Sequence, residues 1–131
     1  MERLSHRLGK QERLSGHKQI DALFGGGSQS VTVYPIRAVY RLSACDGGQP
    51  PVRLLVSVPK RHFKHAVDRN RVKRQLREAY RLQKQVLHEA MRAHEGQELL
   101  LAFIWLSDQH EETARIMRRT GTLLQRISER L

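Results

Sequence analysis

The chain has 131 residues, of which 39% are hydrophobic, and it carries 24 Lys or Arg against 13 Asp or Glu, for a formal net charge of +11. This length suits one domain over residues 1–131, and a pI near 10.8 favours a nucleic-acid partner over an anionic membrane surface. The only cysteine, Cys45, excludes an internal disulfide and a multi-cysteine zinc site. With no apolar run near the roughly 18 residues of a membrane span and no hydrophobic segment after the basic N-terminus, we expect a cytoplasmic protein.

The N-terminal part of the chain predicts a basic arm followed by a short helix. Residues 1–14 lack periodicity, which indicates an arm that is flexible alone and orders on a polyanion. Residues 17–24 place their apolar side chains on one helical face, with Ser15 or Gly16 as the cap. Three glycines at 25–27 end this helix, since Gly tolerates the left-handed conformation beyond a helix C-terminus. The basic residues of the arm are Arg3, Arg7, Lys10 and Arg13.

Two strands are expected next. Residues 31–42 alternate in polarity as a half-buried strand does, and Pro35 marks a strand start or a sheet edge. Residues 52–58 alternate in the same way. A Gly- and Pro-rich loop at 46–51 separates the two segments, so we expect them to pair as a hairpin.

Residues 60–84 hold most of the charge. They contain ten Lys or Arg and two acidic residues, which accounts for +8 of the formal +11. A helix from Asp68 to about Ala93 would present an apolar face and, beside it, a basic face. A solvated amphipathic helix is the alternative, but solvated faces mix charges of both signs, so we favour a surface that binds a polyanion. The apolar face holds Val72, Leu76, Ala79, Tyr80, Val86, Leu87 and Ala90, and the basic face holds Lys73, Arg74, Arg77, Arg81 and Lys84.

Two histidines precede this helix. His62 and His65 could share a metal, but no third ligand completes a set nearby, so we assign them to the basic surface.

The C-terminal part predicts a buried strand and a last helix. Residues 99–105 form a nearly continuous apolar run, as in a central strand. Asp108 and Glu111 resemble a capping box at the start of the last helix. The element order predicts an α+β sandwich in which helices pack on one sheet. The apolar face of the last helix holds Met117, Thr120, Leu123, Leu124, Ile127 and Leu131.

Two segments resemble the signature region of the bacterial ribonuclease P protein component. Residues 54–61 read Leu-Leu-Val-Ser-Val-Pro-Lys-Arg, and residues 66–81 read Ala-Val-Asp-Arg-Asn-Arg-Val-Lys-Arg-Gln-Leu-Arg-Glu-Ala-Tyr-Arg. The element order along the whole chain agrees. The resemblance implies a two-layer α/β sandwich similar to a small-subunit ribosomal protein domain, with the order α-β-β-(β)-α-β-α and a left-handed βαβ crossover.

The resemblance also implies a function. The catalyst would be the ribonuclease P RNA, which removes the 5′ leader of precursor tRNA with Mg²⁺ held mainly by the RNA. The protein would then supply no catalytic residue. Because no acid cluster lies near the motif, we expect no metal ligand in the protein, and we expect no membrane or small-molecule partner. Positions that match the family motif for binding the catalytic RNA are Lys60, Arg61, Arg69, Asn70, Arg71, Lys73, Arg74, Arg77 and Arg81.

The same resemblance implies a cleft for the single-stranded leader. Phe24 and Tyr40 fall where the family has aromatic residues, and Ile20 stands where another aromatic is common. An exposed ring stacks on any base. From the residues alone, core packing explains Phe24 and Tyr40 equally well, and the resemblance favours leader contact more for Tyr40 than for Phe24.

Three other function classes remain for comparison. A ribosomal-type RNA-binding protein would share the basic helix without a role in cleavage. A self-sufficient nuclease would need acid–base residues, and its only candidate group, Asp108, His110, Glu111 and Glu112, is explained mostly by helix-start chemistry. A helix-turn-helix DNA reader fits poorly, because no partner helix precedes the basic helix across a short turn.

Overall fold

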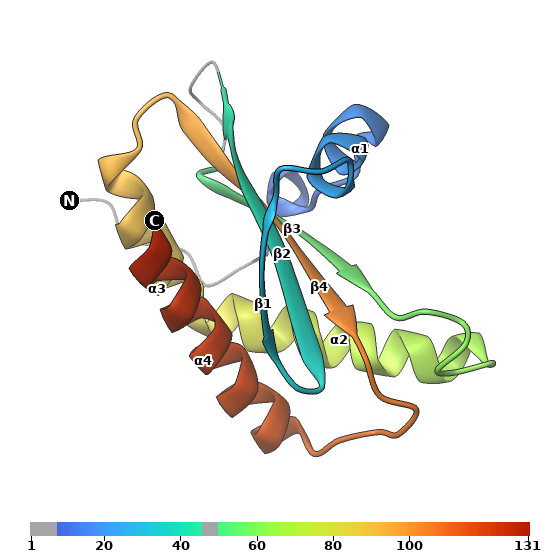
Figure 1. Ribbon diagram of the computed structural model, residues 1–131. Helices are drawn as coiled ribbons and strands as arrows, with labels where there is room; N and C mark the ends of the chain where they lie inside the picture. The colour runs from blue at the N-terminus through green and yellow to red at the C-terminus, as the bar shows by residue number, and fades with distance from the viewer. Residues whose placement is uncertain (1–7, 46–49) are drawn as a thin grey trace.

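The structure, a computed structural model, describes residues 8–45 and 50–131. Within these residues one four-stranded sheet has α1 on one face and the other α-helices on the opposite face (Figure 1). The strands are β1 (Gln29–Val33), β2 (Ile36–Ala44), β3 (Val52–Ser57) and β4 (Gln97–Trp105). The helices are α1 (His17–Phe24), α2 (Ala66–Gln83), α3 (Gln85–Ala90) and α4 (Thr113–Arg130), with short 3-10 turns at Lys10–Glu12 and Met91–Ala93. The predicted α+β class is confirmed.

The strand pairing differs from the prediction. The sheet order is β1-β2-β4-β3, so the expected hairpin between the segments 31–42 and 52–58 is wrong. Instead, β1 and β2 form a hairpin that turns at Tyr34 and Pro35, inside the segment predicted as one strand. β4 lies between β2, which is antiparallel to it, and β3, which is parallel to it. The β3–α2–β4 connection is therefore a βαβ crossover, and its left-handed sense stays a prediction.

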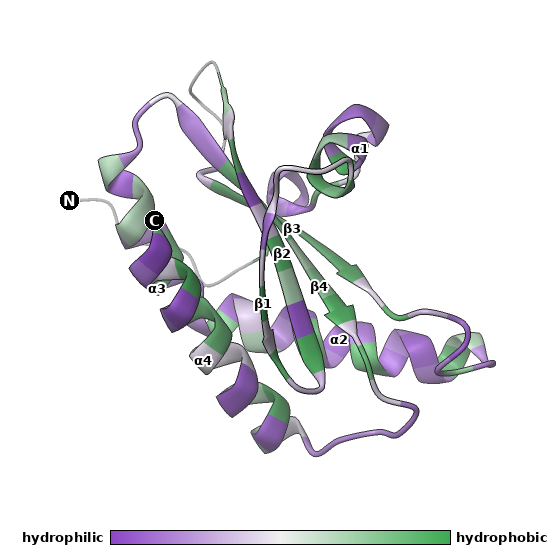
Figure 2. Ribbon diagram, viewed as in Figure 1, coloured by the Kyte–Doolittle hydropathy of each residue, from purple (hydrophilic) through white to green (hydrophobic). Residues whose placement is uncertain are grey.

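β4 explains this order, because it is buried on both faces. Leu99, Leu101 and Phe103 pack in a large core between the sheet and the helices α2, α3 and α4. Leu100 and Ala102 point the other way, into a smaller core beneath α1. A strand that is apolar on both faces is most stable in the middle of a sheet, which confirms the prediction of a central strand. Figure 2 shows that hydrophobic residues dominate β4.

The predicted basic helix is interrupted. α2 begins at Ala66, and Lys84 separates it from α3. His65 takes the N-cap position, so the expected cap, Asp68, lies in the first turn. Burial of the predicted apolar positions of α2 is confirmed for Val72, Leu76, Ala79 and Tyr80.

Lys84 is not on the basic face as predicted. Its side chain is 2% exposed, and its Nζ donates a hydrogen bond to Glu12 Oε1 at 2.8 Å. A buried ammonium group needs such a partner, and the acid that supplies it lies in the N-terminal segment, 72 residues away in sequence.

The two predictions about helix ends had different outcomes. α1 has the predicted bounds, and Gly26 and Gly27 follow it with φ values of +107° and +80°, as a helix stop in the left-handed region requires. α4 begins at Thr113 after Glu112 and has no side-chain capping bond, so the expected capping box is wrong. Among the helices that the structure describes, none combines the length and hydrophobicity needed to cross a bilayer.

Candidate nucleic-acid interface

A basic groove lies between α2 and the N-terminal segment. We call it the α2 groove; it has a volume of about 700 Å³. Its lining residues are Leu8, Arg13, Asn70, Arg74, Arg77, Glu78 and Arg81. The periodicity of α2 brings four of the nine predicted RNA-binding residues to this groove, because positions 70, 74, 77 and 81 follow the three- and four-residue spacing of one helical face.

Arg13 reaches the groove because residues 8–14 are docked on the protein. Leu14 N donates to Leu54 O at 2.8 Å, beside a parallel bridge between Arg13 and Leu54. The buried Glu12 is tied to Lys84. This part of the predicted flexible arm is therefore anchored at the edge of β3, whereas residues 1–7 lie outside the described part of the chain.

The groove concentrates positive charge. Partial burial lowers the pKa of the Arg77 guanidinium, and the positive charge of Arg13 lowers that pKa further. An arginine stays charged in proteins, so this repulsion is a cost to the protein without a ligand. An anion bound between the two guanidinium groups would relieve it.

Glu78 partly offsets the positive charge at the C-terminal end of the groove. Arg81 Nε donates to Glu78 Oε2 at 3.0 Å. This hydrogen bond lowers the pKa of the Glu78 carboxyl and raises the pKa of Arg81. Arg81 must therefore exchange or share this partner to contact a phosphate.

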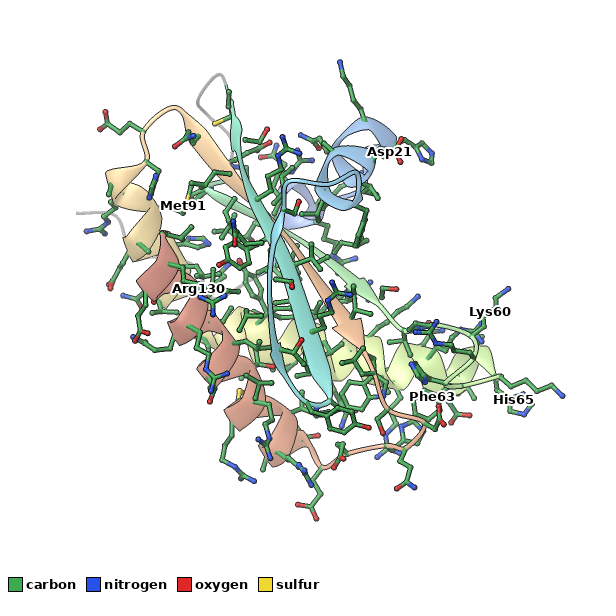
Figure 3. The ribbon with its side chains drawn as sticks, in the orientation of Figure 1. Asp21, Lys60, Phe63, His65, Met91 and Arg130 are labelled. Carbon is green, nitrogen blue, oxygen red and sulfur yellow. The ribbon has the colours of Figure 1, made fainter. Side chains whose placement is uncertain are left out.

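The Arg69 side chain forms hydrogen bonds within the protein. Its Nη1 donates to Phe63 O and to Lys64 O, both at 2.9 Å, which fastens the β3–α2 loop to the first turn of α2. Lys60, Phe63 and His65 lie in this loop region at the N-terminal end of α2, and Lys60 and His65 point into solvent (Figure 3).

Two histidine–aspartate contacts join this loop region to the β4–α4 loop. His62 Nδ1 lies 2.6 Å from Asp108 Oδ1, and His110 Nε2 lies 3.1 Å from Asp68 Oδ1. The His110 ring also stacks on Phe63, with centroids 4.5 Å apart. His62, with its side chain 12% exposed, thus belongs to this junction and not to the basic surface as predicted.

Five of the nine predicted RNA-binding residues do not line the α2 groove. On α2, Arg71 is exposed and Lys73 is half-buried, as are the groove residues Arg74 and Arg77 respectively. Lys60 and Arg61 are exposed in the loop before α2. Residues of the predicted set that do not line the groove are Lys60, Arg61, Arg69, Arg71 and Lys73.

A second hollow, the α1 groove, lies on the opposite face of the sheet and has a volume of about 210 Å³. Phe24, at the end of α1, is 48% exposed beside it. Arg41 Nη1 fixes the end of α1 by donating to Ala22 O at 3.0 Å and to Gly26 O at 3.2 Å. The lining residues are Leu23, Phe24, Gly26, Gly27, Ser28, Gln29, Ser30, Arg37, Val39 and Ile104.

Tyr40 does not share this groove, so the prediction that it and Phe24 form one aromatic cleft is wrong. Tyr40 is 3% exposed and packs in the large core on the other face of the sheet. The reason is strand alternation: Val39 faces α1, and its neighbour Tyr40 must face α2–α4. Ile20 is half-buried and packs against the smaller core under α1. Sequence reasoning missed Arg37, which the same alternation places on the Val39 side.

The described residues include no group of three or more His, Cys, Asp or Glu side chains placed to hold a metal ion. Two members of the candidate nuclease group contact residues outside it. Asp108 contacts His62 in the β3–α2 loop, and His110 contacts Asp68 in the first turn of α2.

Comparisons with known proteins agree with this geometry. A model of the Ribonuclease P family matches residues 8–126. The ribonuclease P protein component of Porphyromonas gingivalis is 40% identical over 121 residues, covering 92% of this chain and 86% of the relative. That of Chlorobaculum tepidum is 34% identical over 109 residues, covering 79% and 70%.

Solved structures show the same fold. The RNase P protein from Thermotoga maritima matches with a TM-score of 0.66 at 20% identity, covering 88% of this chain and 96% of that one. The Staphylococcus aureus RNase P protein matches with a TM-score of 0.60 at 17% identity, covering 88% and 94%. With a family match across most of its length, this chain belongs to the ribonuclease P protein component family, and hence to an endoribonuclease complex that works with an RNA in tRNA 5′ processing.

Proposed function

We propose that this protein binds the ribonuclease P RNA through the α2 groove and the exposed basic residues around it. The observation that carries the proposal is the convergence of Arg13, Arg74 and Arg77 on one groove, in which Glu78 is the only acid among the described lining residues. Guanidinium groups bind phosphate bidentately. A groove walled by several of them suits the backbone of a folded RNA, whose charge would offset the repulsion among the arginines.

The α1 groove is our candidate for the single-stranded leader of precursor tRNA. Phe24 offers an exposed ring for stacking on a base, and Arg37 offers a positive charge in the same hollow. Because these contacts read no base edge, they would accept leaders of varied sequence.

The protein's contribution would then be binding and not bond breaking. By screening phosphates of the RNA and holding the leader, it would reduce repulsion between two polyanions and so strengthen substrate binding. The Mg²⁺ that the family implies would be held mainly by the RNA, with the cytoplasm as the site of action.

The test is cleavage of precursor tRNA at low, near-physiological Mg²⁺ with the protein alone, the ribonuclease P RNA alone, and both together. We expect cleavage in the mixture and little with either component alone. Cleavage by the protein alone would contradict a non-catalytic role. A mixture no faster than the RNA alone would instead favour a ribosomal-type RNA-binding protein.

A further inference from the structure

The outer face of α4 carries a third hollow, which the proposed function does not use. Its volume is about 730 Å³, and it lies where α4 passes the C-terminal end of α2. Figure 2 shows hydrophilic residues along the side of α4 that faces away from the sheet. The lining residues, which we call the α4 face, are Gln83, Arg118, Gly121, Thr122, Gln125, Arg126 and Glu129.

The α4 face has an excess of positive charge, with two arginines against one acid. Arg118 and Arg126 are exposed, and neither has an ion pair among residues 8–45 and 50–131. The one acid of this surface, Glu129, accepts a hydrogen bond from Gln125 Nε2 at 3.3 Å. Over its 18 residues α4 has five arginines and only this acid, an imbalance that ordinary solvated helices avoid.

Gly121 shapes the hollow. A glycine inside a helix costs about 1 kcal/mol relative to alanine, so its presence here needs a reason. A Cβ at position 121 would lie 2.5 Å from Gln83 Oε1. Gln83 is held in place because its Nε2 donates to Ala79 O at 3.1 Å and to Met117 O at 2.9 Å. α2 and α4 thus approach closely at Gly121, which has no side chain and lies between Arg118 and Arg126 in sequence.

We propose that the α4 face is a third RNA-binding surface, distinct from the α2 groove and the α1 groove, that takes the sugar-phosphate backbone of double-stranded RNA. The two arginines are eight residues apart, about 12 Å along the helix axis. That separation suits an extended polyanion better than a single small anion.

The chemistry of the surface favours a duplex over unpaired bases. α4 contains no aromatic residue on which a base could stack. Its arginines suit phosphates, and Thr122 and Gln125 carry polar groups that can bond the ribose 2′-hydroxyls displayed in the wide minor groove of A-form RNA. Recognition would therefore depend on duplex shape and not on sequence. None of the residues that line the α4 face lines the α2 groove.

The test uses an RNA duplex of about 16 base pairs and arbitrary sequence, so that it does not depend on ribonuclease P RNA. The full chain carrying Arg71→Ala and Arg74→Ala serves as the background, because it weakens the α2 surface. Adding Arg118→Ala and Arg126→Ala should lower duplex affinity about tenfold and flatten the plot of log K against log salt by nearly two units, one for each lost phosphate contact.

A charge-matched control decides whether position matters. Lys18→Ala with Arg92→Ala removes two exposed positive charges elsewhere and should change affinity less than twofold. The proposal is overturned if the α4 variant keeps its affinity and slope, or if the control loses as much. Circular dichroism melting checks that each variant is folded. A failed precursor-tRNA cleavage assay would count against the proposed function while leaving the duplex result unaffected.

Discussion

Arg69 and Arg71 are neighbours in the family motif but have different surroundings. Arg69 bonds two carbonyl oxygens of the β3–α2 loop, whereas Arg71 is exposed on α2. The motif predicts RNA binding for both residues, because the sequence carries no sign of which guanidinium is turned inward. The contacts of Arg69 depend on the path of a loop, and loop paths are not encoded in residue spacing.

We expect Arg69→Ala to lower the free energy of unfolding by about 1–2 kcal/mol, since it leaves carbonyl groups without their charged donor. Arg71→Ala should change it by less than about 0.5 kcal/mol. Urea denaturation measures both. Equal stability of the two variants would show that the loop contacts of Arg69 contribute nothing.

Phe24 and Tyr40 likewise share a predicted role, contact with the leader, but have different surroundings. The family motif assigns both residues to the leader cleft, but Phe24 is 48% exposed on the α1 face of the sheet, whereas Tyr40 is buried in the core on the opposite face. Phe24→Ala should weaken binding of precursor tRNA by about 1–3 kcal/mol, with leaderless tRNA as the unaffected control. An equal loss with leaderless tRNA would argue against leader stacking.

Tyr40→Ala should instead destabilise the fold by about 3 kcal/mol, as loss of a buried aromatic does. Tyr40→Phe should be nearly neutral, because the hydroxyl has no hydrogen-bond partner in the described structure. Thermal unfolding distinguishes these outcomes. A stable Tyr40→Ala protein with a specific leader defect would reverse our placement of this residue.

At the scale of secondary-structure elements, the sequence correctly predicted the features that depend on neighbouring residues. α1 has the expected bounds because glycines flank it, and β4 is central because its apolar run is buried on both faces. The pairing of the strands could not be predicted from the sequence. β2 and β3 each alternate in polarity like a strand of a hairpin, but each pairs with β4. The end of α2 could not be predicted either, since Lys84 is stabilised by Glu12, which is distant in sequence.

The Glu12–Lys84 pair joins the N-terminal segment to the α2–α3 junction. Removing one partner leaves a buried charge without its main partner, which typically costs about 3–5 kcal/mol. Because the side chain of Glu12 is 12% exposed, we expect Glu12→Gln to cost about 2 kcal/mol and to loosen Arg13 from the α2 groove. Chemical denaturation and amide exchange at Leu14 test this. Unchanged protection at Leu14 would mean that the pair does not anchor the segment.

His88 lies in the same junction, 3.8 Å from Glu12. Burial lowers its pKa, the charge of Lys84 lowers it further, and Glu12 partly opposes both. In the unfolded chain His88 takes up a proton near pH 6.5, while in the folded protein it does so only at lower pH. Its contribution to stability is therefore complete above about pH 6.5 and is lost as the pH falls through the lowered folded value.

The prediction is that stability decreases between pH 7.5 and 5 and that His88→Gln reduces this decrease. Unfolding free energies of both proteins across that range provide the measurement. Parallel pH profiles would remove His88 as the cause.

At the scale of the whole molecule, three candidate RNA surfaces are divided between the two faces of the sheet. The α2 groove and the α4 face belong to the helices on one side, and the α1 groove lies on the other. Composition could predict a polyanion partner, and the motif could predict the family. Neither could show that residues 8–14 complete the α2 groove, because that depends on the pairing of Leu14 with Leu54.

The central claim is that the basic surface of α2 binds the ribonuclease P RNA. The most direct measurement is the salt dependence of that binding for the wild-type protein and for Arg71→Ala with Arg74→Ala, beside the charge-matched Lys18→Ala with Arg92→Ala. We predict that the α2 variant loses affinity and flattens the slope by nearly two units, while the control stays close to wild type. Equal affinities and slopes for all three folded proteins would contradict the account.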